Sequence, residues 1–387
     1  MTSAHARPPL TLLSDEESLF RRSVRDFAER VIRPRSAAMD REARLDPAVL
    51  AGLFEMGLMG IEVPTELGGA GASFFMSILA VEEISRVDPA VGVLVDVQNT
   101  LLTTALLRYG DEAQRSRFLP RLAGDRPGSY CLSESGSGSD AFALRCRAHP
   151  VDGGFRLEGR KMWVTNARES GLFLIFATVD PEAGYKGISA FLVPRESEGL
   201  TVGKAEDKLG IRASSTCELL LDGCFVPRAQ VLGDVGRGYK VAIELLNEGR
   251  IGIGAQLVGL AQGAFENAVA YAKTREQFGR PIAANQAMQF WLAELAIEVE
   301  SARLMVYNAA RLREAGAPFA REAAMAKYHA SQVAERVASR AVEVFGGAGF
   351  TKEFPAEKLY RDAKIGKIYE GTSFMQLQTL AKLILAD

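Results

Sequence analysis

The sequence predicts a mainly α-helical fold with a small β domain in its middle. Three stretches of different residue spacing, within 387 residues, predict this fold class. Apolar residues recur every three or four positions from Ser14 to about Ala123 and again beyond Gly238, as they do in helices. Between these stretches, short β-prone runs alternate with turn residues. We therefore expect three domains: a helical domain at 1–126, a β domain at 127–233 and a helical bundle at 234–387.

The first helical block starts with a recognisable cap. Ser14 and Glu17 have the spacing of a capping box, in which each side chain bonds the other residue's backbone N–H. Glycines interrupt the helical spacing between Gly57 and Gly71, and it resumes from Phe74 through Leu107. The apolar residues expected along the first helix are Leu19, Phe20, Val24 and Phe27.

The middle and last domains have contrasting patterns. β-branched and aromatic residues mark four expected strands, at Phe155–Leu157, Leu172–Val179, Ile188–Val193 and Glu218–Val226. Long antiparallel helices packed as a bundle are expected in the last domain. One face of such a helix is marked, at steps of three and four, by Met288, Trp291, Leu292, Leu295, Val299, Ala302 and Val306.

The composition is typical of a globular protein, with 48% hydrophobic and 24% charged residues. A net charge of -2 gives no chain-wide attraction to nucleic acid or to an anionic membrane surface. We find no apolar run expected to cross a bilayer, so membrane insertion is not expected. The stretch Met1–Leu13 lacks the pattern of a secretory signal. These features favour a bacterial cytoplasmic protein, or a mitochondrial matrix protein if the source is a eukaryote.

The cysteines and histidines predict no metal site. No C-x-x-C pair occurs, and only three histidines accompany the cysteines. No disulfide framework is suggested either, so buried thiols in a reducing compartment are expected. The four cysteines are Cys131, Cys146, Cys217 and Cys224.

Two segments of the middle domain could approach a large ligand. In Tyr130–Asp140, small residues let the backbone come close and offer amides and hydroxyls, although a surface turn explains the segment equally well. In Lys161–Asn166, the indole of Trp163 could stack on a planar heteroaromatic ring. A tryptophan in a strand is more often part of a core, so neither segment alone decides a function.

Two segments of the bundle could meet phosphate groups. Arg275 opens a charged break, Arg275–Pro281, and could pair with a phosphate, although a solvated charge at a helix end is the simpler interpretation. The glycine cluster in Phe345–Phe350 could expose amides to a diphosphate. The end of a helix followed by a turn would explain the same glycines.

The last segment, Arg361–Thr372, contains a carboxylate in an unusual setting. Glu370 lies between an aromatic residue and Gly371. A glutamate before a helix is usually a surface acid. If it instead points into an apolar cleft, desolvation raises its pKa and suits it to act as a general base on a weak carbon acid.

These five segments, in this order and at these intervals, resemble the acyl-CoA dehydrogenase family over nearly the whole chain. The likeness is strongest to the short/branched-chain members, through Lys208–Thr216, Asn247–Gly252 and Ala326–Ala330. The resemblance implies an N-terminal helical domain, a middle β domain and a C-terminal four-helix bundle. It also implies a homotetramer with FAD between the β domain and the bundle.

The resemblance implies a reaction as well. Such an enzyme removes hydrogens from the α and β carbons of a short acyl-CoA thioester, straight or branched, and forms a trans-2-enoyl-CoA. Glu370 matches the catalytic base, which takes the α proton. One branch of the family has its base where Gly249 stands here, and a glycine cannot act as a base. The electrons would pass from the flavin to an electron-transfer flavoprotein.

The remaining site residues are implied by position in the same resemblance. The flavin contacts within one subunit are Tyr130, Leu132, Ser133, Trp163, Thr165, Thr372 and Phe374. The contacts with the FAD of a neighbouring subunit are Arg275, Gln277, Phe278, Gln286, Glu343, Gly346 and Gly347. The residues near the CoA and thioester groups are Ser139, Tyr185, Tyr239, Asn247, Arg250 and Gly371.

Alternative functions are compatible with parts of this pattern. An acyl-CoA oxidase-like flavoenzyme would use oxygen as electron acceptor, but acyl-CoA oxidases are longer. A straight-chain butanoyl-CoA dehydrogenase differs only in the acyl group. A flavin-containing binding protein would lack the base, and a purely structural helical bundle leaves five coincident motifs unexplained.

Overall fold

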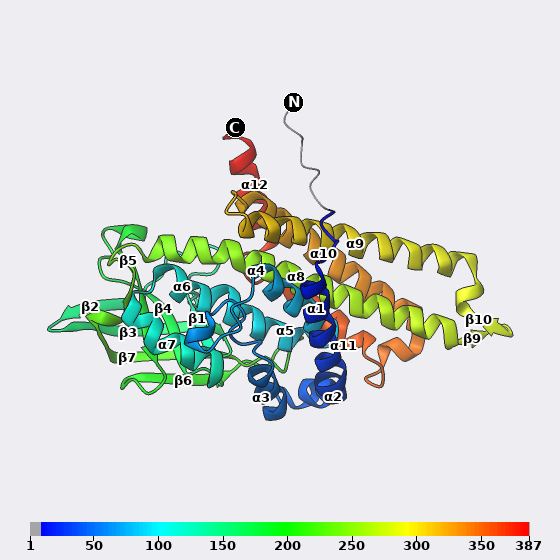
Figure 1. The fold of residues 1–387 in the computed structure, drawn as a ribbon, viewed down its shortest axis with the longest axis horizontal. Helices are drawn as coiled ribbons and strands as arrows, with labels where there is room; N and C mark the ends of the chain where they lie inside the picture. Colours follow the sequence, from blue (N-terminus) through cyan, green and yellow to red (C-terminus); the bar gives the residue numbers. More distant parts are fainter. Residues whose placement is uncertain (1–8, 387) are drawn as a thin grey trace.

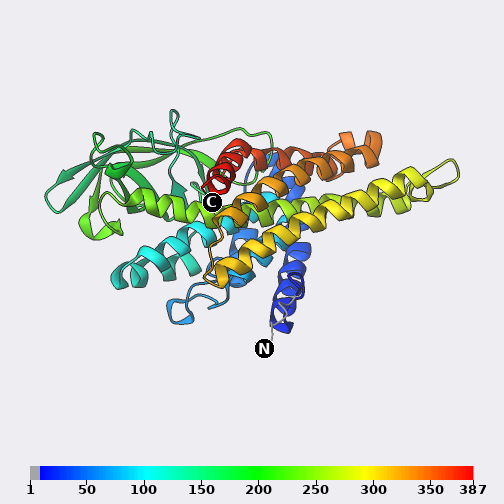
Figure 2. The same ribbon diagram turned by 90° about the horizontal axis from the view of Figure 1, so that it is seen from above.

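A computed structural model describes residues 9–386, so most of Met1–Leu13 lies outside the described part of the chain. The β sheet lies at one end of the molecule with helices packed beside it, and long helices extend to the opposite end (Figures 1 and 2). The order along the chain is helices, then sheet, then helices. This is the predicted fold class, which is therefore confirmed.

The N-terminal region is helical, as expected. Its first helix carries the predicted capping box, in which Ser14 and Glu17 bond each other's backbone N–H. Val24 and Phe27 are buried, whereas Leu19 is 59% exposed, so the expected inner face is wrong at that residue. The helices are α1 Asp15–Phe27, α2 Arg33–Glu42, α3 Pro47–Glu55, α4 Phe74–Ser85, α5 Pro89–Asp96, α6 Thr104–Tyr109 and α7 Glu112–Gly124. Two π-helical segments, Ala28–Ile32 and Val97–Thr103, join neighbouring helices.

One continuous helical stretch shows that the expectation of no apolar run long enough to cross a bilayer is wrong. Pro89–Tyr109, which runs from α5 through α6, is long and apolar enough to cross a membrane, with a mean hydropathy of 1.5 over its best window. Of that window, 94% is buried inside the protein. An apolar helix at the centre of a large core has the same composition as a membrane-spanning helix, because both avoid water on every side.

The β region forms one eight-stranded sheet. The strand order is β6-β7-β3-β2-β4-β5-β8, and β1 pairs in parallel with β4. The four predicted strands correspond to β3 Gly154–Thr165, β4 Leu172–Thr178, β5 Ile188–Pro194 and β7 Thr216–Pro227. Sequence reasoning did not identify β1 Gly128–Cys131, β2 Arg147–Val151, β6 Leu200–Ala205 and β8 Val231–Leu232, which are short or largely exposed.

The C-terminal region is a bundle of long helices. They are α8 Gly238–Thr274, α9 Gln286–Glu314, α10 Ala320–Phe345, α11 Ala356–Ala363 and α12 Ser373–Ile384. The predicted face of α9 is confirmed, since Leu295, Val299, Ala302 and Val306 are buried. A two-stranded hairpin, β9 Glu276–Gln277 and β10 Arg280–Pro281, lies at the far tip between α8 and α9 (Figure 1).

Two hydrophobic cores meet at the sheet. On strand β4, Leu174 and Phe176 belong to a core shared with the helices, whereas Phe173 and Ile175 belong to a second core on the other face. Alternate residues of a strand point to opposite faces, which is why one strand supplies both cores. All four cysteines are free and buried, as predicted, and they lie in the second core. The sheet is thus fixed against the helical region that carries Glu370.

Candidate active site

Glu370 lies in a strained turn just before α12. Its φ is +52° and that of Gly371 is +85°, so two successive residues adopt the left-handed conformation. Such backbone is unfavourable for a residue with a side chain and persists where surrounding contacts hold it. Contacts from the surrounding structure must therefore stabilise this turn.

Buried polar side chains from three helices hold the turn. Lys327 of α10 donates a hydrogen bond from Nζ to the carbonyl of Gly371 at 2.6 Å. Gln376 of α12 donates from Nε2 to the carbonyls of Glu370 and Gly371, at 3.2 and 2.9 Å. The hydroxyl of Tyr369 donates to Gln256 of α8. These contacts direct the Glu370 side chain inward.

The Glu370 carboxyl group is sheltered. Its Oε2 is buried and has no hydrogen-bond partner within residues 9–386. A Cβ added to Gly249 would lie 3.1 Å from this oxygen and 3.1 Å from Leu101, so the glycine of α8 provides the space for the carboxyl group. Burial raises the pKa of Glu370 to about 7, while the positive charges of Lys327 and Arg250 oppose that rise. A carboxyl group with this pKa can act as a general base near neutral pH.

Lys327 was not identified by sequence reasoning. Its side chain is completely buried, and burial lowers its pKa to about 8, although the negative charge of Glu370 acts in the opposite direction. Near neutral pH it therefore still carries a positive charge beside the base. A single lysine among the small residues Ala323, Ala324, Ala326 and Ala330, on the inner face of α10, is the signal that could have identified it.

A second buried carboxyl group, also missed, lies next to the first. Asp96, the last residue of α5, is completely buried and accepts a hydrogen bond from Thr100 at 2.9 Å. It packs over Gly252 of α8, one helical turn after Gly249, and a Cβ there would lie 1.7 Å from Asp96 Oδ1. An aspartate within the apolar run of α5 is the sequence signal that could have marked it.

This crowding leads to a stability prediction. We expect Gly252→Ala to lower the free energy of unfolding by about 3 kcal/mol, because the new methyl group overlaps the Asp96 carboxyl group and cannot be accommodated without displacing it. Urea unfolding monitored by circular dichroism measures the change. Gly124→Ala, at an open position of α7, is the matched control and should cost nothing. Equal stability of the two variants would contradict the packing of Asp96 on α8.

The residues predicted to contact the flavin lie at the ends of β1 and β3. Tyr130 is half-buried and Leu132 is buried, while Trp163 has a φ of +62° and remains 58% exposed. Ser133 and Thr165 are partly exposed. The indole is therefore available to a planar ligand rather than part of a core. Burial raises the pKa of Tyr130 well above its usual value. The charge of Glu370 adds to this shift, so Tyr130 lies within electrostatic range of the base.

A buried ion pair supports this end of the sheet. Lys161 of β3 is completely buried and donates to Glu134 at 2.7 Å and to the carbonyl of Leu132 at 3.0 Å. Glu134 also accepts the backbone N–H groups of Arg145 and Cys146. The pair thus fixes the backbone that runs past Leu132 and Ser133.

The residues predicted near the CoA and thioester groups form two pairs, and two further residues lie apart from them. Tyr185 and Tyr239 pack edge to face, with ring centroids 4.9 Å apart. On α8, Asn247 accepts a hydrogen bond from Arg250 at 2.8 Å, and the charge of Arg250 acts on Glu370. Ser139 is exposed on its loop. Gly371 belongs to the turn that holds the base.

The residues predicted to reach a neighbouring subunit are all exposed and do not join Glu370. Arg275, Gln277 and Phe278 form the hairpin at the far tip of the bundle (Figure 2), where Phe278 is 100% exposed. Of the two predicted residues after the base, Thr372 caps α12 through a hydrogen bond from Met375, and Phe374 is 82% exposed. The other exposed members of the neighbouring-subunit set are Gln286, Glu343, Gly346 and Gly347.

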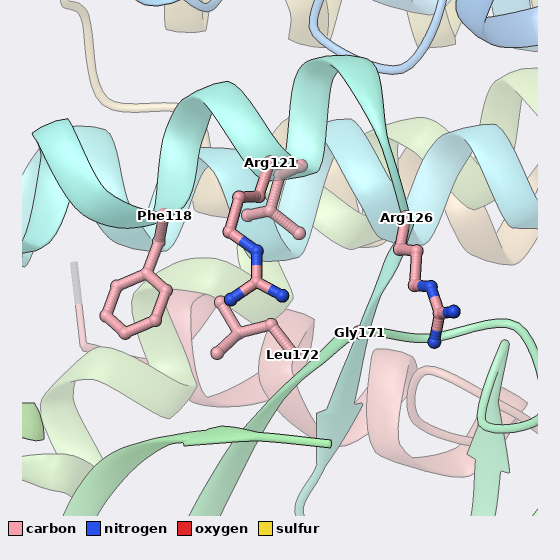
Figure 3. Close-up of a pocket in the computed structure, with 6 residues that line it drawn as sticks. Phe118, Arg121, Arg126, Gly171 and Leu172 are labelled. Carbon is pink, nitrogen blue, oxygen red and sulfur yellow. The ribbon is translucent and has the colours of Figure 1, made fainter. Parts of the chain in front are cut away.

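Two hollows of the surface lie elsewhere. The smaller, about 10 Å³, lies between α7 and the start of β4, where Arg121 extends toward Leu172 (Figure 3). It has room for about one water molecule and includes no predicted site residue. The larger, about 390 Å³, is lined by Arg336, Arg340 and Glu343 among others, so it contains one predicted FAD contact.

Comparison with family models decides the family. Residues 14–126, 129–224 and 236–385 match, in turn, the N-terminal, middle and C-terminal domains of acyl-CoA dehydrogenase. The chain belongs to the acyl-CoA dehydrogenase family. Acyl-CoA dehydrogenases are FAD-dependent oxidoreductases, so the implied reaction class and cofactor are confirmed together with the resemblance.

Individual acyl-CoA dehydrogenase relatives agree with this assignment. A probable short/branched chain specific acyl-CoA dehydrogenase of Dictyostelium discoideum is 56% identical over 98% of this chain and 92% of its own length. The butyryl-CoA dehydrogenase of Megasphaera elsdenii has a solved structure with a TM-score of 0.95 and 36% identity, over 97% of this chain and 99% of that one. A chain in the solved structure of the electron transferring flavoprotein of Acidaminococcus fermentans has a TM-score of 0.96 and 39% identity, over 97% and 100%.

Proposed function

We propose that this acyl-CoA dehydrogenase oxidises short, branched acyl-CoA thioesters to trans-2-enoyl-CoA, with Glu370 as the catalytic base. The observation that supports this role is the buried, unpartnered Oε2 of Glu370, whose carboxyl group has a pKa raised to about 7. A free lone pair that faces the interior and a pKa near the working pH are the two properties that a general base requires.

The residues present fit an FAD cofactor. The exposed indole of Trp163, the partly exposed Thr165 and the backbone of Leu132 and Ser133 form one edge of the β domain. We propose that they bind the flavin ring, with Tyr130 between this edge and the base. When bound, FAD would serve as the acceptor of the β hydride. The buried Lys161 and Glu134 pair keeps this edge in place.

The work of the remaining residues follows from their positions. Glu370 receives the α proton at its carboxyl group, Lys327 and Gln376 keep the turn from rotating, and the packing around Gly249 buries the Oε2 of the base. We propose that Tyr185, Tyr239, Asn247 and Arg250 position the thioester, with Ser139 near the CoA. Correct alignment supplies much of the rate acceleration in such a reaction.

The partners of the enzyme are part of the same proposal. We propose an electron-transfer flavoprotein as acceptor, a homotetramer as assembly and no insertion into a membrane. The exposed hairpin residues Arg275, Gln277 and Phe278, with Gln286, Glu343, Gly346 and Gly347, would then contact FAD in a neighbouring subunit. Their full exposure in one subunit supports this role, because a large aromatic side chain such as Phe278 is rarely left in water.

The substrate is tested by turnover of the purified flavoprotein with acyl-CoA thioesters of graded length and branching and an artificial electron acceptor. We expect the highest kcat/KM for short branched groups such as 2-methylbutanoyl or isobutanoyl. The 56% identity to the short/branched-chain relative, against 44% for the short-chain specific acyl-CoA dehydrogenase of Bos taurus, supports this order. A preference for butanoyl or for long straight chains would refute the branched assignment, and oxygen consumption during turnover would indicate an oxidase.

Lys327→Met provides a prediction on pH dependence. The positive charge of Lys327 lowers the pKa of Glu370, so its removal raises that pKa. Because Glu370 must be ionised to act as a base, the acid limb of kcat/KM, expected near pH 7 in the wild type, should move upward by about one pH unit. Lys382→Met, at an exposed position of α12, is the control and should leave the limb in place. An unshifted limb in Lys327→Met would contradict the interaction.

A further inference from the structure

The carboxyl group of Asp96 is a buried titratable group that the proposed reaction does not use. It is completely buried, and its Oδ2 has no hydrogen-bond partner within residues 9–386. Its other oxygen accepts from Thr100 alone. No lysine, arginine or histidine of the described chain forms a salt bridge with it. An ionised carboxylate in such a place would be strongly unfavourable, because its charge would be neither solvated nor paired.

The carboxyl groups of Asp96 and Glu370 pack over two neighbouring glycines of α8. The Glu370 carboxyl group fills the space over Gly249, and that of Asp96 fills the space over Gly252. Residues three apart in a helix are neighbours on one face, with side-chain origins roughly 5–6 Å apart. The two carboxyl groups therefore lie close enough to influence each other's protonation, and the charge of Glu370 raises the pKa of Asp96.

The charged groups around this pair are unequally distributed. The cations that lower the pKa of Glu370 are Lys327 of α10 and Arg250 of α8. The negative charge of Glu370 also raises the pKa of Tyr130 in β1. The charge of Glu370 raises the pKa of Asp96, and burial together with the charge of Asp96 raises the pKa of Tyr369. Within residues 9–386, two cations thus act on Glu370, and none forms a salt bridge with Asp96.

We propose that Asp96 is a positioning residue for the base: the two buried carboxyl groups together hold one negative charge, and Asp96 keeps the proton. This inference rests on the proposed role of Glu370. Burial and the charge of Glu370 both raise the pKa of Asp96 well above its usual value, in agreement with the geometry. The π-helical segment Val97–Thr103 begins directly after Asp96 and brings the hydroxyl of Thr100 onto the carboxyl group.

The consequence for the reaction concerns charge. A second negative charge close to Glu370 would oppose the enolate character that develops as Glu370 removes the α proton. A protonated Asp96 fills the same space without that charge. It also lets Glu370 ionise near neutral pH, since an ionised Asp96 would raise the pKa of Glu370 further.

Infrared spectroscopy of the resting flavoprotein tests the protonation directly and needs no turnover. Above the pKa of Glu370, we expect the wild type to keep a carbonyl band of a protonated carboxyl group that is missing from Asp96→Asn. In Glu370→Gln, the band should disappear at a pH about one unit lower, because the neighbouring charge is gone. Absence of the band in the wild type, or an unchanged titration in Glu370→Gln, would overturn the proposal.

The pH profile of kcat/KM is the second measurement. Asparagine resembles a neutral aspartic acid, so Asp96→Asn should keep the acid limb at its wild-type position. An ionised Asp96 predicts the opposite result, a downward shift of about one pH unit in the variant, because a negative charge next to Glu370 is removed. If Asp96→Asn does not fold, the titration in Glu370→Gln still decides. If the wild type shows the carbonyl band but oxidises none of the acyl-CoA thioesters, the proposed function is refuted, whereas the proposal that Asp96 keeps the proton is not.

Discussion

Glu370→Gln is expected to lower kcat by about 10²- to 10⁴-fold, the range that a lost general base accounts for. The amide has nearly the shape of the carboxyl group but cannot accept the α proton. No hydrogen bond to the Glu370 side chain is lost, since its buried Oε2 has no partner. The variant should therefore fold, retain FAD and bind the thioester, yet its flavin absorbance should not bleach when substrate is added under anaerobic conditions.

The control is Glu55→Gln, which makes the same chemical change at an exposed position of α3. It should bleach at the wild-type rate. Rapid bleaching in Glu370→Gln would show that Glu370 is not the catalytic base and that another group takes the α proton. Loss of FAD from Glu370→Gln would show instead that the turn before α12 had been disturbed, and Glu370→Asp would then separate the two effects.

Lys161→Met is expected to lower the free energy of unfolding by about 3–5 kcal/mol, the usual cost of removing one partner of a buried ion pair. Glu134 would remain buried with a negative charge and only two backbone N–H groups to balance it. The carbonyl of Leu132 would lose its donor as well. Because Leu132 and Ser133 belong to the proposed flavin edge, the variant should also release FAD more readily.

Urea unfolding and flavin fluorescence measure the two effects of Lys161→Met. The matched control is Lys204→Met in β6, where the same substitution occurs on an exposed lysine of the same sheet. It should change stability by less than about 0.5 kcal/mol. A Lys161→Met protein as stable as this control would mean that the ion pair contributes nothing to the edge of the sheet.

Much of the fold could be predicted because the signals are local. The capping box at Ser14 and the spacing along α9 are properties of neighbouring residues. The strands that escaped prediction, such as β2 and β6, gain their structure from pairing with distant strands and carry little burial pattern of their own. Leu19 and the apolar stretch Pro89–Tyr109 misled for a related reason, since hydrophobicity alone does not say what covers a residue.

The candidate site shows the same division. By itself, the sequence determined the fold class, the family through its five segments, and Glu370 as the candidate base. Only the tertiary structure showed that Lys327, Asp96 and Gly249 surround that carboxyl group, from elements far apart in the chain. The physical reason is that a pKa depends on burial and on charges across space. Neighbours in space are chosen by how the helices pack, and no local pattern of residues records that choice.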